Sequence, residues 1–469
     1  MAQFLCSSAQ QDEALSTITI GNWPFYGEVA RACCREDGSE LLSRQAWWWR
    51  NRAARRGVMT RYRSVLVVFL PFAAGYYLSY LFRMINAVIA RPLVYELGID
   101  AGQLGFLTSV YFLTFAAVQL PLGAAIDRFG PRRVQAALLV FAAAGALVFA
   151  NAAGLWGLLI GRGLIGLGAA AALVAGLKAI ADRFPQERLP LVNGAFVAFG
   201  AAGAVTATAP LEWLLTHFTW REVFLALAAA TVVVALIVLL VAPETATRRR
   251  SGTSAPLHVQ AIYLDQRFWR LAPLSALCIG SAWALQGLWA APWLADVALL
   301  DRSGIVRHLM AMAMALCVGA LLIGIVADRA RRRGIGTEAV LIAAACLFIA
   351  AELALVCRVP LPSIGLWAIV ACMGAGTVLS YALLADLFPR EIAGRANAAL
   401  NVLHIGGAFA IQTAIGLIIG SWQPDAAGQY PALAYKVAFA AIILLQVAAL
   451  LWFLRPYFIA RRAREVSSR

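Results

Sequence analysis

The sequence contains few charged residues. Only 13% of its 469 residues are Asp, Glu, Lys or Arg, whereas 62% are hydrophobic. A soluble globular chain is closer to half apolar and a quarter charged, so a soluble fold is excluded. Several apolar runs exceed the roughly 20 residues that a helix needs to cross a bilayer. Strands of a membrane barrel would alternate polar and apolar residues over about 10 positions, which this chain does not do. The composition predicts an all-α membrane protein.

Short catalytic motifs are also missing. The chain lacks a pair of carboxylates in the middle of a predicted span, so no such pair supports proton coupling. It also has no Walker loop, HExxH, paired CxxC or GxSxG. These absences argue against an ATP-driven pump and against an enzyme, and they predict no cofactor and no bound metal. The eight cysteines show no metal-ligand spacing beyond the adjacent Cys33 and Cys34. Free thiols are ordinary in apolar cores, so we assign the cysteines no chemistry.

The net charge of +15 comes from arginines that gather in alternate loops. We count 30 Lys and Arg on segments predicted to be cytosolic, 6 on external segments and 3 within spans, which together make 39. This distribution follows the positive-inside rule, so both termini are predicted in the cytosol and nucleic acid is not a predicted partner. The Arg- and Ala-rich composition indicates a GC-rich genome and therefore a bacterial inner (cytoplasmic) membrane.

Residues 1–63 differ from the rest and contain no signal peptide. They form either a cytosolic N-terminal extension resting on anionic lipid, or the product of a start assigned too early, with Met59 as the true initiator. The short step from Met59 into the first span favours the second interpretation.

Twelve apolar segments follow, and six on each side of a polar linker predict two pseudo-symmetric six-helix bundles. The predicted spans are 65–89, 104–125, 134–152, 155–181, 190–215, 221–241, 271–294, 308–327, 338–356, 363–386, 395–420 and 432–454. The predicted parts are a first bundle (64–242), a cytosolic linker (243–270), a second bundle (271–454) and a basic cytosolic tail (455–469).

A charged loop between spans 2 and 3 reads Gly-Ala-Ala-Ile-Asp-Arg-Phe-Gly-Pro-Arg-Arg, from Gly123 to Arg133. A shorter form returns in the second half at Gly324, Asp328 and Arg329. The two glycines of the repeat lie 201 residues apart (324 − 123), and the two aspartates share that offset. The repeat indicates a parallel duplication whose pseudo-twofold axis lies along the membrane normal.

Twelve spans in two halves with this loop resemble the major facilitator superfamily. The family's loop signature is Gly, three residues, Asp-Arg, one residue, Gly, one residue and two basic residues. The matching positions here are Gly123, Asp127, Arg128, Gly130, Arg132 and Arg133, and Arg162 with Gly166 resembles the family's Arg-x-x-x-Gly element. The resemblance runs from about residue 64 onward. It implies a secondary transporter with proton coupling as the default energy source. We expect a monomer whose partners are a small-molecule substrate, the lipid bilayer and protons.

The aspartates of the repeat are predicted to hold a cytosolic gate, and Arg162 is grouped with the two loops as part of this gating motif. A carboxylate at a helix end can accept amide hydrogens from the N-terminus of a neighbouring helix. Symmetry predicts the start of span 11, near Gly394 and Arg395, as the target of Asp127. The start of span 5, near Pro190, is the corresponding target of Asp328. Such contacts would form with the gate shut and break when it opens. The alternative is that the loop only anchors the protein to lipid phosphates.

Polar side chains follow one face of span 1 at spacings of 4, 3 and 3. They are Tyr76, Tyr80, Arg83 and Asn86. An arginine at this depth needs an acid, water or an anionic ligand, and span 1 contains no acid. The stretch resembles the Asp-Arg-x-Asn element of the superfamily's organic anion:cation symporters, with Phe82 in place of the acid. This resemblance implies that Arg83 holds a substrate carboxylate. The alternative is a structural partnership with a distant acid such as Glu212.

Three further spans add candidate cavity residues, which are Trp283, Gln286, Tyr381, Asn401 and His404. Gln286 is the counterpart of Asn86 in the repeat, so the two amides could form a substrate floor. The tryptophans of span 7 could instead form an interfacial belt, which suits Trp293 but not Trp283, since Trp283 should lie deeper.

His404 and Glu212 are the candidates for proton coupling. The ordinary pKa of a histidine, about 6.5, suits a proton carrier, although a lone histidine can equally be a packing residue. Lys178 and Asp182 are predicted to form a local ion pair near the inner end of span 4.

These features predict an alternating-access secondary transporter, a symporter for a small organic or inorganic anion. One alternative is an efflux carrier for a neutral or amphipathic solute. A non-transporting membrane sensor is the alternative of another class.

Overall fold

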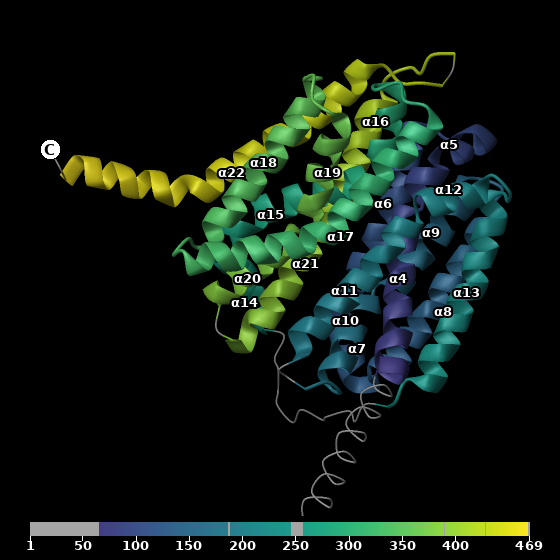
Figure 1. Cartoon of the computed structure of the whole chain (residues 1–469), viewed down its shortest axis with the longest axis horizontal. Helices are drawn as coiled ribbons and strands as arrows, with labels where there is room; N and C mark the ends of the chain where they lie inside the picture. The colour runs from purple at the N-terminus through teal and green to yellow at the C-terminus, as the bar shows by residue number, and fades with distance from the viewer. Residues whose placement is uncertain (1–64, 186–187, 245–256, 389, 427, 468–469) are drawn as a thin grey trace, which may run out of the picture. The chain divides into compact units, whose positions relative to one another are not determined.

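The computed structural model describes residues 65–185, 188–244, 257–388, 390–426 and 428–467. The predicted N-terminal extension up to residue 64, its alternative start at Met59 and residues 245–256 of the predicted linker lie outside these residues. Every regular element of the described chain is a helix, and Figure 1 shows their arrangement.

The first half runs from the start of the described chain to residue 244. Its elements are η1 (Val65–Phe69), α4 (Leu70–Met84), α5 (Asn86–Leu97), α6 (Ala101–Ala117), α7 (Gln119–Phe129), α8 (Pro131–Ala150), α9 (Leu155–Ala169), α10 (Ala172–Ala181), α11 (Leu189–Thr206), α12 (Ala209–Leu215) and α13 (Trp220–Val241).

The second half begins at residue 257 with a short helix in the predicted linker. Its elements are α14 (Leu257–Leu264), α15 (Gln266–Ala284), η3 (Leu285–Trp289), α16 (Ala290–Asp296), α17 (Arg302–Arg332), α18 (Thr337–Val356), α19 (Ser363–Met373), η4 (Gly374–Gly376), α20 (Thr377–Leu387), α21 (Arg390–Gly420) and α22 (Ala432–Ser467). The predicted basic tail continues the last helix.

Eleven helical stretches within the described residues are long and apolar enough to cross a membrane individually. A twelfth span arises if α6 and α7, which bend by 55° at their junction, count as one. Pro121 follows this break, and proline removes a helix hydrogen bond and clashes with the preceding turn. The predicted all-α fold with twelve spans is confirmed.

Several spans are broken where the sequence predicted one continuous helix. Span 1 breaks at Ile85 between α4 and α5, and span 7 passes through the π-helix η3 before α16. Span 10 tightens into a 3₁₀ turn at Gly374–Gly376. Mid-helix departures of this kind gather at functional sites. Here the first two lie where the two halves meet, since η3 contacts both α4 and α5.

The two halves meet most closely along α6 and α21, near the end of the bundle predicted to face outside. Glycines provide this contact. A Cβ atom on Gly416 would lie 2.9 Å from the carbonyl oxygen of Ala101 and 3.1 Å from the Cα atom of Gly105. A Cβ atom on Gly420 would lie 3.0 Å from the amide nitrogen of Gly102. Small residues let membrane helices approach backbone to backbone. We call these four glycines the glycine seam.

Polar contacts between the halves gather at the same predicted outer end. Arg302 of α17 forms an ion pair with Glu212 of α12, with 2.5 Å between Nη2 and Oε2. The same Nη2 donates to the carbonyl oxygen of Val88 at 2.9 Å. Tyr430 lies across the seam and accepts a hydrogen bond from the amide of Ala101 at 3.1 Å. Together with the glycine seam, these contacts close the predicted outer end.

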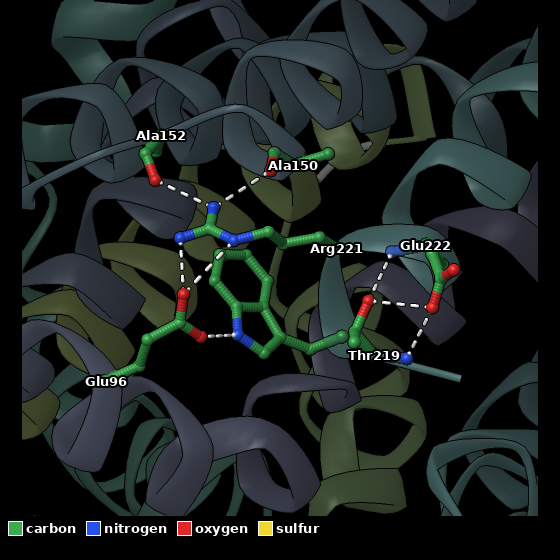
Figure 2. A network of polar contacts seen from close by, with 7 residues as sticks. Glu96, Ala150, Ala152, Thr219, Arg221 and Glu222 are labelled. Atoms are coloured by element: carbon green, nitrogen blue, oxygen red, sulfur yellow. Dashed lines mark hydrogen bonds and ion pairs between the residues drawn. The ribbon is translucent and has the colours of Figure 1, made fainter. Parts of the chain in front are cut away.

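A second network stiffens the first half at this end (Figure 2). Glu96 accepts hydrogen bonds from the Trp220 indole at 2.6 Å and from Nη2 of Arg221 at 2.6 Å. Nη1 of Arg221 donates to the carbonyl oxygens of Ala150 and Ala152. The network joins the ends of α5 and α8 to the start of α13. The Trp220 hydrogen bond, followed by those from Arg221, holds the pKa of Glu96 below its usual range.

Replacing Glu96 by Gln should lower the stability of the purified protein at neutral pH by about 1 kcal/mol, since the Glu96 side chain is partly exposed. Because the folded pKa is depressed, the stabilisation is present above the unfolded pKa. It is lost as the pH falls through the folded pKa. Melting temperatures of wild type and Glu96→Gln should therefore differ at neutral pH and converge in acid. Asp182→Asn, at an exposed aspartate, is the control and should match wild type at both pH values. An equal gap for Glu96→Gln in acid would contradict the linkage.

Candidate functional site

Arg83 lies in the last turn of α4, just before the break at Ile85. Its guanidinium carbon is 4.9 Å from the ring centroid of Tyr80, 5.1 Å from Trp283 and 5.8 Å from Phe115. The side chain is 8% exposed, its Nε has no hydrogen-bond partner, and it forms no ion pair with a described carboxylate. Aromatic faces from both halves therefore surround this cation.

Arg162 of α9 is fully buried and contacts the backbone next to Arg83. It donates to the carbonyl oxygens of Phe82 at 2.6 Å and of Arg83 at 3.4 Å, and it lies over the Tyr111 ring at 4.8 Å. These carbonyls lie at the C-terminal end of α4, which carries partial negative charge. Arg162 thus fixes the backbone from which Arg83 projects and adds a second positive charge to the site.

The sequence grouped Arg162 with the gating loop, but the structure does not bring them together. Lys178, which does contact the loop, lies further along the same span, roughly 24 Å away at 1.5 Å per residue. The role of Arg162 at the α4–α5 break was missed because it depends on which backbone the side chain meets.

The remaining span 1 residues divide between the site and its support. Tyr80 contacts Arg83 directly, and Tyr76 meets Tyr80 edge to face at 5.2 Å. Tyr76 also stacks on Phe196 of α11 at 5.1 Å, which fixes its ring. Asn86 donates to Thr108 of α6 at 3.0 Å.

Asn86 and Gln286 are both buried, and each keeps a carbonyl oxygen without a hydrogen-bond partner. Gln286 lies in η3, beside the α4–α5 break. No hydrogen bond joins the two amides among the described contacts, so each amide keeps its own free acceptor oxygen.

Four predicted residues of the second half form one cluster. His404 lies beside Trp283 at 6.3 Å and Tyr381 at 5.6 Å between ring centroids, and the Tyr381 hydroxyl donates to Asn401 at 2.8 Å. Trp283 also contacts Arg83, so it joins this cluster to the first half. The Trp283 side chain is 8% exposed.

The sequence missed the hydrogen-bond chain behind this cluster. His404 Nε2 is 2.6 Å from the Ser275 hydroxyl, which donates to Ser380 at 2.7 Å, while His404 Nδ1 has no partner. Ser275 lies eight residues before Trp283 on α15 and shares its face, so helical spacing could have identified it.

Loop contacts at the predicted inner end run within each half. Asp127 forms an ion pair with Lys178 of α10. The predicted pair of Lys178 with Asp182 is therefore wrong. A lysine that precedes its acid by four residues is the less favourable order on a helix, and at Asp182 only the backbone amide, not the carboxylate, bonds the end of α10. Arg133 pairs with Glu244, which follows α13, at 2.5 Å.

In the second half Asp328 pairs with Arg331 at 3.1 Å and Arg332 at 2.8 Å, both on α17. The predicted contacts of Asp127 and Asp328 with the starts of α21 and α11 are not among the described contacts. The side chains of Pro190 and of several residues around Gly394 lie outside those that the structure describes.

Glu212 lies at the predicted outer end and is bound by Arg302 through two hydrogen bonds, at 2.7 and 2.5 Å. The alternative in which Glu212 is the partner of Arg83 is therefore wrong. The centre thus holds two buried guanidiniums and no paired acid among the described residues.

Comparisons with known proteins agree with this arrangement. The sequence model of the Major Facilitator Superfamily matches residues 72–349, more than half of the chain. A hexuronate transporter of Escherichia coli is 31% identical over 155 residues, which cover 32% of this chain and 35% of that protein. A galacturonate transporter of Dickeya chrysanthemi is 30% identical over 165 residues, which cover 34% of this chain and 47% of that protein. The chain therefore spans less than half the length of these relatives.

A solved structure shares the fold at low identity. It is a bacterial homologue of the human lysosomal transporter Spinster in an inward-facing, unoccupied conformation, with a TM-score of 0.66 and 19% identity. The match covers 84% of this chain and 96% of that one. On the family match and the twelve-span fold, this chain belongs to the Major Facilitator Superfamily, an integral membrane family of small-molecule transporters that are not enzymes.

Proposed function

We propose that this protein carries a small organic anion of the sugar-acid class, such as a hexuronate, across the bacterial inner membrane by alternating access. The observation that carries the proposal is the setting of Arg83. This buried guanidinium lies where the two halves meet and has no described acid as its partner.

Charge is the first argument for an anion. A cation taken out of water needs compensation, and aromatic faces supply about 1–2 kcal/mol each. A substrate carboxylate can supply more, because it can form two parallel hydrogen bonds with a guanidinium. Arg162 adds to the positive potential, and its Nη1 and Nη2 atoms donate to carbonyl oxygens of α4, whereas Arg83 lies against Trp283 of the second half and is the guanidinium proposed to meet the ligand.

Recognition of a hydroxylated ring is the second argument. Asn86 and Gln286 each keep a buried acceptor oxygen near the α4–α5 break. Tyr80 and Trp283 present aromatic faces beside Arg83, and Tyr381 with Asn401 adds a polar pair from the second half. A sugar acid has the carboxylate, the hydroxyl donors and the ring C–H surface that match these groups. The relatives named for hexuronate and galacturonate support this class.

Alternating access is supported by where the halves contact each other. The glycine seam and the Glu212–Arg302 ion pair close the predicted outer end. At the predicted inner end, Asp127 and Asp328 pair within their own halves. We propose that this state is open to the cytosol, with both chain termini on that side. In the opposite state Asp127 would exchange Lys178 for the start of α21, and Asp328 would likewise turn to the start of α11.

We propose proton symport as the energy source and a monomer as the working form. His404 is one candidate carrier, because its Nδ1 is unpaired and its ring lies beside Trp283 and Tyr381. Glu212 is committed to Arg302, so its proposed part is in the outer closure and any proton coupling would require that ion pair to open.

Replacing Arg83 by Ala should reduce galacturonate affinity about 10- to 100-fold, because a charge-assisted hydrogen bond contributes roughly 1.5–3 kcal/mol. The measurement is ligand-induced thermal stabilisation of the purified full chain. Arg83→Lys should recover only part of the affinity, since lysine lacks the planar fork. Arg307→Ala, at an exposed outer arginine, is the control and should bind like wild type.

Full affinity in Arg83→Ala would remove Arg83 from the binding site. Stabilisation only by neutral or amphipathic compounds, unaffected by Arg83→Ala, would favour efflux of such solutes instead.

Replacing Asp127 by Asn should slow transport in proteoliposomes while expression stays near normal. The substitution removes the charge that holds Lys178 in one state and that would meet a helix N-terminus in the other. Asp182→Asn, which changes an exposed aspartate near the same end, should transport like wild type. Unchanged uptake by Asp127→Asn would leave the loop as a lipid anchor only.

A further inference from the structure

A buried carboxyl group in the second half is not used by any contact described so far. Glu352 lies on α18, a helix that is otherwise apolar over its last three turns, and its side chain is 3% exposed. Its Oε2 atom has no hydrogen-bond partner, and it forms no ion pair with a described cation. A single carboxylate in a span, unlike a pair, has no spacing in the sequence that marks it as a candidate.

The surroundings of Glu352 come from three helices, since α15, α18 and α22 pack against one another. A side-chain hydrogen bond links Gln446 of α22 to the carboxyl group, and Gln446 Nε2 also donates to the Ser281 hydroxyl of α15 at 2.9 Å. The Oε1 atom of Gln446 is buried and has no partner. Cys278 on α15 and Cys346 on α18 are the titratable groups that face this cluster among the described contacts.

A single proton on Glu352 would reduce the number of unsatisfied polar atoms in this cluster. An ionised carboxylate buried in apolar surroundings without a partner costs several kcal/mol. A protonated carboxyl is neutral and has an O–H group that needs an acceptor. The cluster contains such an acceptor, since Gln446 Oε1 is buried without a donor, and the Oε2 atom of Glu352 is also without a partner. The geometry therefore favours the protonated form in this conformation.

Helix α15, which packs against α18, also carries Trp283 of the proposed anion site. Ser281 and Cys278 turn to the Glu352 side of α15, whereas Trp283 on the opposite side contacts Arg83 and His404. The π-helix η3 follows directly at Leu285. A π-helical turn holds one residue more than an α-helical turn and occurs frequently at functional sites. A change of charge on Glu352 therefore acts on the same helix that carries Trp283, whose ring lies over Arg83.

We propose that Glu352 is the residue whose proton is coupled to anion binding at Arg83, an inference that rests on the proposed anion symport. A proton moves from water to the Glu352 carboxylate and returns to water on the other side of the membrane. Protonation removes a negative charge from behind α15 and so strengthens anion binding. By linkage, the bound anion raises proton affinity by the same factor.

The binding arm of the test uses the purified full chain with galacturonate as the probe, from mildly acidic to mildly alkaline pH. Wild-type affinity should rise about tenfold toward acid, within the range usual for coupled sites. Glu352→Gln mimics the protonated group and should keep the high affinity at every pH. Glu352→Leu, of similar volume, should also lose the pH dependence. Glu222→Gln is the matched control, because glutamine can also complete the capping box of α13.

The infrared arm needs no substrate. A protonated carboxyl in an apolar site gives a C=O stretch separate from that of carboxylates. This band should be present in wild type and Glu222→Gln at neutral pH and absent from Glu352→Gln. A band that survives in Glu352→Gln would overturn the proposal.

The two arms separate the proposals from each other. If wild type fails to bind galacturonate, the proposed substrate fails, while the infrared band still decides whether Glu352 holds a proton. If Glu352→Gln retains the pH dependence of affinity, the coupling is overturned. A loss of pH dependence only in His404→Gln would overturn it as well and would assign the proton to His404.

Discussion

The structure depends on how charge is compensated where water is scarce. In a bilayer an isolated ion is costly, so each buried charge needs a specific partner. Arg162 uses backbone carbonyl oxygens released at the break between α4 and α5, and Arg302 uses Glu212 at the junction of the halves. Arg83 has only aromatic faces, and Glu352 has no charged partner among the described contacts. The two incompletely compensated groups lie on opposite sides of α15.

The helix breaks follow from the same constraint. A continuous α-helix satisfies its own backbone and leaves few carbonyl oxygens for other groups. The interruption at Ile85 gives Arg162 its acceptors and aims Arg83 at Trp283 of the other half. The π-helix η3 lies beside this interruption. The centre of the protein is therefore built from two irregular segments supported by regular helices.

Composition and spacing predicted the twelve spans, the duplicated halves and the stripe that carries Arg83, because these depend on hydropathy and helical periodicity. They did not predict partners that come from tertiary packing. Lys178 meets Asp127 of the preceding loop rather than Asp182 on its own helix, and Arg162 meets the backbone of span 1. Ser275 shares a face with Trp283 and could have been found from spacing. Glu352 has no second acid near it in the middle of its span, so only its burial distinguishes it.

The glycine seam has a consequence for how the protein opens and closes. Where backbone meets backbone, no side chain has to be fixed in one rotamer when the contact forms, so closing there loses little conformational entropy. A contact that loses little entropy on forming and gains only weak attractions can separate and return without a high barrier. The glycine seam therefore lets the two halves slide together and apart, but it contributes little to holding them closed. The force that keeps the outside shut must then come from the ion pair beside it and from the ligand.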